Sequence, residues 1–475
     1  MHDIPLRPQQ NIVGLALMAV LMALGIAVLK PGVGPYVALG MVVVIVAFAS
    51  VQAALYLLIL SMLFSPEIAV GTVQGRGVGG REVSIRMDDI LLLVVGFAWF
   101  AKSILYREFK LIKHTPVNRP IVYYMLACVL ATLVGILLGR VQPKTGFFFV
   151  LKYFEYFFVF LMVIGHVTTK DQAAHLIVVL LVTCCLICVY AIAQIPSGQR
   201  ATAPFEGESG EPNTLGGYLV FIMALVVGLL MHLRHVPARF LLLILMVLAV
   251  IALGATLSRT SYLAAGVLLL AVGMAQWRKP AVLASVLLIA ALIPVLAPAS
   301  VKQRVSDTFF GRQYGGEIKV GKNIGIDLST TQRLQSWQNV LSEWVHQPLL
   351  GYGVTGYAWA DAQYVKILGE TGLAGISAFI FMIYRLWRTA REALLKETDP
   401  FCRGIAQGFL LGMIAMLAHG VGANTFILIR IMEPFWLCAG LVMLLPTLEG
   451  KATEAAGEPA DAWRAMIPAR MTAAR

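Results

Sequence analysis

The chain has 475 residues, of which 59% are hydrophobic and 13% are charged, and its mean hydropathy is +0.81. Charged residues make up about a quarter of a soluble domain, so this composition excludes a soluble globular protein. The apolar runs are continuous, as in 241–253 and 281–296, whereas the strands of outer-membrane barrels alternate apolar and polar residues. The sequence therefore predicts an all-α fold, a polytopic bundle of transmembrane helices. A net charge of +12 then indicates basic cytoplasmic loops or an anionic lipid substrate, and not nucleic acid.

Apolar segments long enough to enter a bilayer recur along the whole chain. They lie at about 11–29, 35–50, 51–65, 89–105, 120–139, 147–166, 174–195, 214–231, 240–257, 262–276, 281–297, 369–386, 405–421 and 434–447. No polar break divides 35–65, so we expect roughly 12–14 helices.

The short loops set the orientation. Lysine and arginine gather at 106–119, 232–239, 277–279 and 387–404, all on one side if there are fourteen spans. The positive-inside rule makes that side cytoplasmic, together with both termini. We therefore predict a multi-pass protein of the bacterial inner membrane.

Two longer polar loops, 196–213 and 298–368, then face the periplasm. They belong to a predicted core at 196–448, which follows N-terminal helices at 1–195. The tail at 449–475 is rich in Ala, Glu, Pro and Arg and is expected to be cytoplasmic, either disordered or a surface helix.

Arg259 lies at the tip of a helical hairpin with almost no loop, on the periplasmic side. Such an arginine either reaches toward the membrane surface or binds an anion, because its planar guanidinium matches a phosphate group. Ser258, Thr260 and Ser261 flank it, and their hydroxyls and the backbone N–H groups of the next helix would add donors. We interpret this tip as an anion site.

The loop 196–213 carries Arg200 and Glu211 and enters the next helix with a cap near Asn213. The simplest interpretation is a turn followed by a cap. Arg200 and Glu211 are more polar than a turn requires, so both are candidate substrate-binding residues.

The loop 298–368 contains apolar residues at helical spacing from Arg333 to Trp344, which predicts an amphipathic helix on the membrane face. A glycine-rich turn follows, and then a polar segment that includes Asp361 and Tyr364 before the next membrane helix. A carboxylate there is either a charge that the helix dipole favours or a general base.

The order of these motifs resembles the O-antigen ligase and Wzy-type polymerase superfamily. The motifs are Ser-Arg-Thr at 258–260, Arg-x-x-x-Trp from Arg333, His-Gln-Pro-Leu-Leu-Gly-Tyr-Gly at 346–353 and Leu-Gly-Glu-Thr-Gly-Leu-Ala-Gly at 368–375. The resemblance covers roughly 195–385, and the earlier helices match only in character.

This resemblance implies transfer of a glycan from undecaprenyl pyrophosphate to an acceptor sugar hydroxyl at the periplasmic membrane face, with neither a metal nor another cofactor. By the resemblance Arg259 would hold the donor pyrophosphate, and Arg200 and Arg333 would contact phosphate or sugar. Partners would be the lipid-linked donor, a glycan or lipid-linked acceptor, membrane lipids and other polysaccharide export or assembly proteins.

Asp361 stands where ligases of this family carry a histidine, the proposed base, in a His-Asn-x-Tyr-Leu motif. Because polymerase-type members accept acidic residues there, the difference favours a polymerase over a ligase. An aspartate in a dry environment could deprotonate an acceptor hydroxyl. His346 is the nearest alternative base, although its place beside Pro348 suggests a structural role.

Three alternatives stay open at this point. One is an O-antigen ligase that transfers glycan to a lipid A core or another carrier. Another, from a different class, is a lipid-linked sugar flippase or transporter. The third is a non-catalytic assembly factor with a decayed site. Transporters usually place charges near mid-membrane, whereas this chain gathers them at one membrane edge.

Overall fold

The structure is a computed structural model of the whole chain. It describes residues 51–64, 67–75, 78–86, 89, 91–92, 96, 114–204, 210–296, 298–310, 319–320, 324–325, 328–357 and 361–455. The expected spans at 11–29 and 35–50, most of the span at 89–105 and the tail beyond 455 lie outside these residues.

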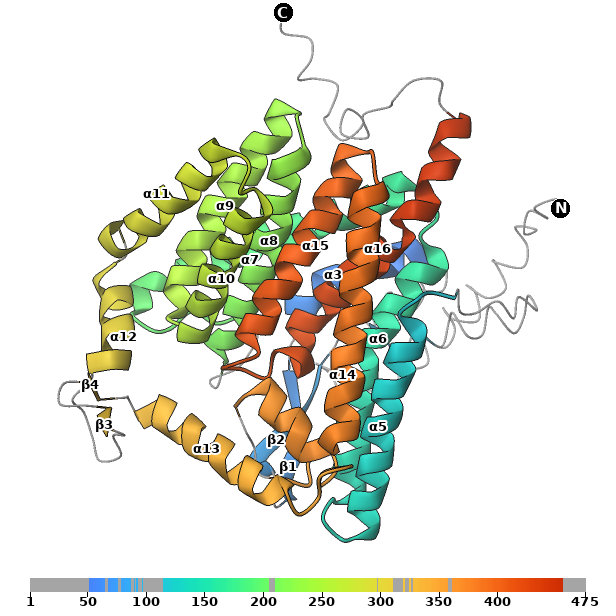
Figure 1. Cartoon of the computed structure of the whole chain (residues 1–475), viewed down its shortest axis with the longest axis vertical. Coiled ribbons are helices and arrows are strands. Elements are labelled where there is room, and N and C mark those ends of the chain that lie inside the picture. The colour runs from blue at the N-terminus through green and yellow to red at the C-terminus, as the bar shows by residue number, and fades with distance from the viewer. Residues whose placement is uncertain are drawn as a thin grey trace, which may run out of the picture.

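The described chain folds into an all-α bundle, as the composition predicted (Figure 1). Its helices are α3 (Val51–Phe64), α5 (Asn118–Leu137), α6 (Pro143–His166), α7 (Lys170–Ala193), α8 (Pro212–His232), α9 (Val236–Thr256), α10 (Arg259–Ala275), α11 (Pro280–Leu296), α12 (Ala299–Phe310), α13 (Leu328–Trp344), α14 (Gln363–Lys396), α15 (Pro400–His419) and α16 (Ile429–Ala455). Short 3-10 turns, η1 (Ile195–Ser197) and η2 (Thr425–Ile427), precede α8 and α16.

Eight of the described helices are long and apolar enough to cross a membrane, namely α5 to α9 and α14 to α16. The helices α3 and α10 are apolar but shorter. Each overlaps a segment that the sequence predicted as a span, although α14 begins six residues before the predicted span 369–386 and ends ten residues after it. The protein is therefore a multi-pass membrane protein.

Two small antiparallel hairpins complete the described fold. Strands β1 (Glu67–Gly75) and β2 (Val78–Arg86) pair with each other, as do β3 (Lys319–Val320) and β4 (Ile324–Gly325). Figure 1 shows both hairpins at the same end of the bundle as α12 and α13, opposite the end of α16. No strands were predicted from the sequence in either segment.

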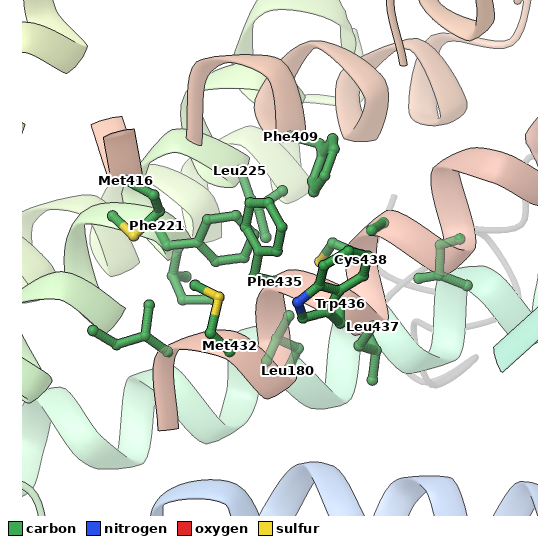
Figure 2. Packing of buried hydrophobic residues seen from close by; sticks show 14 of the residues in the cluster. Leu180, Phe221, Leu225, Phe409, Met416, Met432, Phe435, Trp436, Leu437 and Cys438 are labelled. Atoms are coloured by element: carbon green, nitrogen blue, oxygen red, sulfur yellow. The ribbon is translucent and has the colours of Figure 1, made fainter. Parts of the chain in front are cut away.

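The centre of the bundle is made by α8, α15 and α16. Gly228 of α8 lies against Gly404 and Gly408 of α15, and a Cβ on Gly228 would clash with their backbone. Small residues allow two membrane helices to approach this closely. Figure 2 shows the aromatic core beside this contact, where Phe435 and Trp436 of α16 pack with side chains of α7, α8 and α15.

The helix α14 is broken near its N-terminal end. Gly372 has φ 61° and ψ −158°, a conformation open almost only to glycine, and the helical backbone bonds are interrupted there. The break leaves N–H and C=O groups that must be satisfied elsewhere in a membrane protein. The partners are supplied by the glycine-rich turn 346–353.

Candidate functional site

The tip of the α9–α10 hairpin places Arg259 at the first position of α10. Leu257 takes the left-handed conformation, with φ 48°, which reverses the chain within two residues. Ser258 is the N-cap of α10, and its side chain accepts a hydrogen bond from the Ser261 N–H at 3.3 Å. Arg259 is half-buried. The Arg259 side chain therefore extends from the N-terminus of α10, which is the positive end of the helix dipole and favours anions.

The three hydroxyls beside Arg259 are hydrogen-bonded within the protein. Ser258 Oγ donates to Asn213 Oδ1 at 2.7 Å, and Thr260 Oγ1 donates to the Gly422 carbonyl at 3.4 Å. Ser258 and Ser261 are fully buried and share a further bond of 2.8 Å. These contacts hold the hairpin tip in place within the protein. Substrate binding by Ser258 stays a prediction.

Arg200 lies against the same hairpin tip. Its Nε donates to the Thr256 carbonyl at 3.1 Å, and its Nη2 donates to the Leu257 carbonyl at 3.3 Å. The neighbouring Ala201 N–H donates to the Ala255 carbonyl at 2.9 Å. Arg200 thus satisfies the carbonyls at the end of α9. A guanidinium carries five N–H donors, so these two bonds leave capacity for an anion.

Three arginines from other segments act electrostatically on Arg200. Burial lowers the pKa of the Arg200 guanidinium, and the positive charges of Arg304, Arg259 and Arg333 lower it further. The loop after α7, the start of α10, α12 and α13 therefore contribute cations to one region. Such a concentration of like charge is costly in isolation and attracts a multivalent anion.

Arg304 is the member of this group that the sequence analysis did not select as a site residue. It lies on α12, a short helix within the loop 298–368, and is half-buried. The sequence showed it only as one of several arginines on the outward face. Its proximity to Arg200 depends on the fold and not on any motif.

Arg333 is half-buried on α13, which begins at Leu328, five residues before the expected start. The expected amphipathic helix is present, with Val340 buried and Leu341 exposed. Figure 1 shows α13 lying across the end of the bundle between α12 and α14.

Glu211 is exposed and is the N-cap of α8, although its side chain makes no cap hydrogen bond. The observed cap therefore lies two residues before Asn213, where it was expected, since α8 begins at Pro212. The side chain of Asn213 instead accepts the hydrogen bond from Ser258. A carboxylate at Glu211 is favoured by the helix dipole, and a contact with substrate stays a prediction.

Asp361 is exposed and lies two residues before α14. Next to it the fold is rigid, because Gln363 N–H donates to the Gly420 carbonyl at 3.0 Å. The hydroxyl of Tyr364 donates to the Leu417 carbonyl at 2.5 Å, which ties the start of α14 to α15. A base role for Asp361 then requires bound acceptor to exclude water from an open carboxylate.

The glycine-rich turn and the break in α14 bind each other through the backbone. Tyr352 N–H donates to the Gly369 carbonyl at 2.9 Å, and Gly353 N–H donates to the Glu370 carbonyl at 2.8 Å. Beyond the break, Leu373 N–H donates to the Pro348 carbonyl at 2.8 Å. Two of the four motifs that carried the resemblance, 346–353 and 368–375, therefore form one structural unit.

The buried carboxylate of Glu370 stabilises this unit. It accepts hydrogen bonds from Thr355 N–H at 3.1 Å and Tyr153 Oη at 3.3 Å, and pairs with Lys366 Nζ at 2.9 Å. Glu370 and Lys366 are 5% and 7% exposed, so the charges compensate each other away from water. His346 is exposed at the end of α13, with Nδ1 3.2 Å from the Glu343 carbonyl oxygen, in keeping with a structural role.

One turn brings the arginine tip and the Asp361 segment to the same neighbourhood. The turn between α15 and α16 accepts a bond from Thr260 at Gly422 and a bond from Gln363 at Gly420. Arg259 precedes Thr260, and Asp361 lies two residues before Gln363. The two predicted catalytic residues therefore lie beside segments bonded to one turn, Arg259 at the start of α10 and Asp361 just before α14.

The comparison with known families bears on this arrangement. Residues 244–380 match the family model described as O-Antigen ligase. This match supports the expected resemblance to the O-antigen ligase and polymerase superfamily over these residues. The matched segment runs from within α9 to within α14, and so contains Arg259, Arg304, Arg333 and Asp361. Arg200 and the turn between α15 and α16 lie outside it. A search of curated proteins found no match.

The family supports membrane glycosyl transfer of the O-antigen ligase or polymerase type. The segment that matches the family model, residues 244–380, contains three of the four arginines, Arg259, Arg304 and Arg333. The sequence expectation of this superfamily is confirmed, while the roles of individual residues stay predictions.

Proposed function

We propose that this protein is a polysaccharide polymerase that transfers a glycan from undecaprenyl pyrophosphate to an acceptor sugar hydroxyl. The observation that carries the proposal is the group of four arginines at one end of a membrane bundle. A pyrophosphate joined to a polyprenyl chain is an anion fixed at a membrane surface, and it matches both features. The proposed place is the periplasmic face of the bacterial inner membrane, with both termini in the cytoplasm.

The proposed reaction is one displacement at the anomeric carbon. The acceptor hydroxyl oxygen forms a bond to this carbon, the bond from the carbon to the phosphate oxygen breaks, and undecaprenyl pyrophosphate leaves. Negative charge grows on the leaving oxygen, and Arg259, Arg200 and Arg333 would stabilise it, with Arg304 as a fourth cation. A single displacement inverts the configuration of the sugar and requires no metal ion.

The proton of the acceptor hydroxyl must move to a base as the new bond forms. We assign this role to Asp361, since it lies two residues before Gln363, which bonds to the same turn as Thr260 beside Arg259. General base catalysis typically contributes about 10²–10⁴-fold. Tyr364 lies one turn further along and would orient the acceptor, and Glu211 would contact a sugar hydroxyl at the mouth of the site.

A ligase is the second candidate, because the matched family model is described as O-Antigen ligase. A ligase would use the same donor chemistry with a lipid A core or another carrier as acceptor. The replacement of the family histidine by Asp361 favours the polymerase. The flippase is the weaker alternative, since arginines from four segments gather at one end of the bundle. Membrane lipids and export proteins would be further partners of either enzyme.

The test is conversion of undecaprenyl-pyrophosphate-linked repeat units by the purified protein in lipid nanodiscs. A ladder of products is expected from a polymerase, and a single transfer to an added core acceptor would show a ligase instead. Arg259→Ala should lower either activity by about 10²–10³-fold. The matched control is Arg278→Ala, because Arg278 is an exposed arginine in the turn at the other end of α10. Full turnover by Arg259→Ala would contradict the pyrophosphate role, and no turnover by the wild type would contradict the function.

A further inference from the structure

The turn that joins α15 to α16, residues 420–428, is hydrogen-bonded to the two segments that carry Arg259 and Asp361. Thr260 and Gln363 bond to it from the hairpin tip and from the start of α14. Beyond the turn, Arg430 Nη1 donates to the Pro204 carbonyl at 3.3 Å, in the loop that carries Arg200. The turn lies outside the segment that matches the family. It is therefore a candidate element for setting the geometry of the site.

His419 links this turn to the α9–α10 hairpin. The side chain is fully buried at the end of α15. Its Nε2 shares a hydrogen bond of 3.1 Å with Ser261 Oγ, and its Nδ1 shares one of 2.7 Å with Thr425 Oγ1. Both ring nitrogens are thus engaged, one with α10 and one with the turn. A rigid ring bonded on two sides fixes the distance between the groups that it joins.

The chain of hydrogen bonds continues from Ser261 to the cap of α10. Ser261 Oγ bonds to Ser258 Oγ, and Ser258 in turn bonds to Asn213 at the start of α8. Four segments are therefore joined in one buried network, and Arg259 lies between its two serines in the sequence. A shift of this network would move the first turn of α10 and the guanidinium with it.

Two glycines of α8 leave the space that the network occupies. A Cβ at Gly216 would clash with Ser261 Oγ and would lie 2.7 Å from Ser261 Cβ. A Cβ at Gly217 would lie 2.6 Å from Ile431 Cδ1 and 2.9 Å from His419 Cε1. Alanine would be a better helix former at both positions. Gly216 is therefore explained by the close approach of Ser261, and Gly217 by the close approach of Ile431 and the imidazole.

We propose that His419 is a positioning residue, which through Ser261 fixes the start of α10 and so aims Arg259 at the donor pyrophosphate. The proposal rests on the proposed function. His419 itself is fully buried and does not touch substrate. Its effect is to hold the guanidinium at the place where charge develops, and misplacement by about 1 Å can cost about 10²-fold in rate.

Two amide variants separate the bond to Ser261 from the bond to Thr425. The amide nitrogen of His419→Gln reaches the place of Nε2 and can bond to Ser261, whereas His419→Asn reaches only the place of Nδ1 and can bond to Thr425. Both keep a buried polar amide of similar character. We expect His419→Gln to retain kcat/KM for the donor within about threefold, and His419→Asn to lose roughly ten- to hundredfold.

The pathway through Arg259 is tested by combining variants. The His419→Asn effect should appear in the donor KM or kcat, with the acceptor KM unchanged, and it should vanish when Arg259→Ala is already present. A merely structural role would act on donor and acceptor alike and would multiply with Arg259→Ala. Residual activity of Arg259→Ala is measured with single turnovers at high enzyme concentration.

A second perturbation leaves every hydrogen-bonding group in place. Gly216→Ala displaces Ser261 by its methyl group and should lower donor kcat/KM as His419→Asn does. Gly266→Ala is the matched control, because Gly266 lies on α10 and a Cβ there meets no atom within 4 Å. It should keep full activity.

These measurements distinguish the failure of the inference from the failure of the function. Activity in the wild type with equal activity in His419→Asn and Gly216→Ala would overturn the positioning role alone. Equal losses in His419→Gln and His419→Asn, or losses that multiply with Arg259→Ala, would also overturn it. A wild-type protein with no activity toward the lipid-linked donor would refute the function on which the inference rests.

Discussion

The buried pair of Glu370 and Lys366 gives a quantitative prediction for the unit formed by the glycine-rich turn and the broken helix α14. Replacing Glu370 by Met leaves the Lys366 ammonium without its carboxylate in a site that is 7% exposed. It also removes the acceptor of Thr355 N–H and of the Tyr153 hydroxyl. Loss of one partner of a buried pair costs about 3–5 kcal/mol, so Glu370→Met should be strongly destabilising.

Lys366→Met is expected to cost less, because the Glu370 carboxylate keeps its hydrogen bonds to Thr355 and Tyr153. The double variant removes both charges, and apolar replacement of a whole buried pair is often neutral or stabilising by about 1–4 kcal/mol. What remains is the cost of unpaired polar groups, about 1–3 kcal/mol for each. The double variant should therefore be more stable than Glu370→Met alone.

The assay is equilibrium unfolding of the purified protein in mixed micelles with an increasing fraction of SDS, followed by tryptophan fluorescence. The surface pair Arg388 and Glu392 on the same helix serves as control, since both side chains are about half exposed and surface pairs contribute about 0–1 kcal/mol. Additive effects of the two Met substitutions would show that Lys366 and Glu370 do not act as a pair, and would refute this reasoning.

Three further predictions follow from the described contacts. Gly372→Ala should lose activity and stability, because its Cβ would lie 2.5 Å from the Leu349 carbonyl, whereas Gly266→Ala should lose neither; equal unfolding curves would contradict this. Asp361→Asn should lower kcat by about 10²–10⁴-fold with the donor KM unchanged, and an unchanged kcat would place the base elsewhere. Lys302→Cys, in a Cys185→Ala background, should react with a membrane-impermeant maleimide added outside spheroplasts, and labelling only after lysis would reverse the proposed orientation.

The bundle was predictable from the sequence because each membrane helix carries its own local signal. Continuous apolar runs give the position of a span, and the described membrane helices overlap the predicted spans, with α14 extending ten residues beyond the predicted end. The amphipathic helix α13 was predictable from the spacing of its apolar residues, although its first turn, Leu328 to Gln332, lacks that pattern.

The contacts between segments were not predictable in the same way. The hydrogen bond between His419 and Ser261 joins residues 158 positions apart, and no periodicity connects them. The break at Gly372 lies inside an apolar run that predicts an uninterrupted helix, and its cause is the backbone of the turn 348–353. Arg304 joins the other arginines only because α12 folds back toward the hairpin tip.

The motifs selected segments that lie against one another in the structure. Arg259 was selected because it lies at a hairpin tip with almost no loop, and the structure places Arg200 against that tip. The two glycine-containing motifs were noticed separately, while the structure shows them bonded to each other. The motifs therefore indicated the residues of the unit and not the way in which they pair.

The central claim is that arginines of different segments form one pyrophosphate site. The most direct measurement is the binding of undecaprenyl pyrophosphate to the purified protein in nanodiscs. We expect one site per chain, with affinity reduced roughly tenfold, or about 1.4 kcal/mol, in each of Arg259→Ala, Arg304→Ala and Arg333→Ala. Lys302→Ala, an exposed cation on the same helix as Arg304, should bind as the wild type does. Wild-type affinity in all three arginine variants would contradict the account.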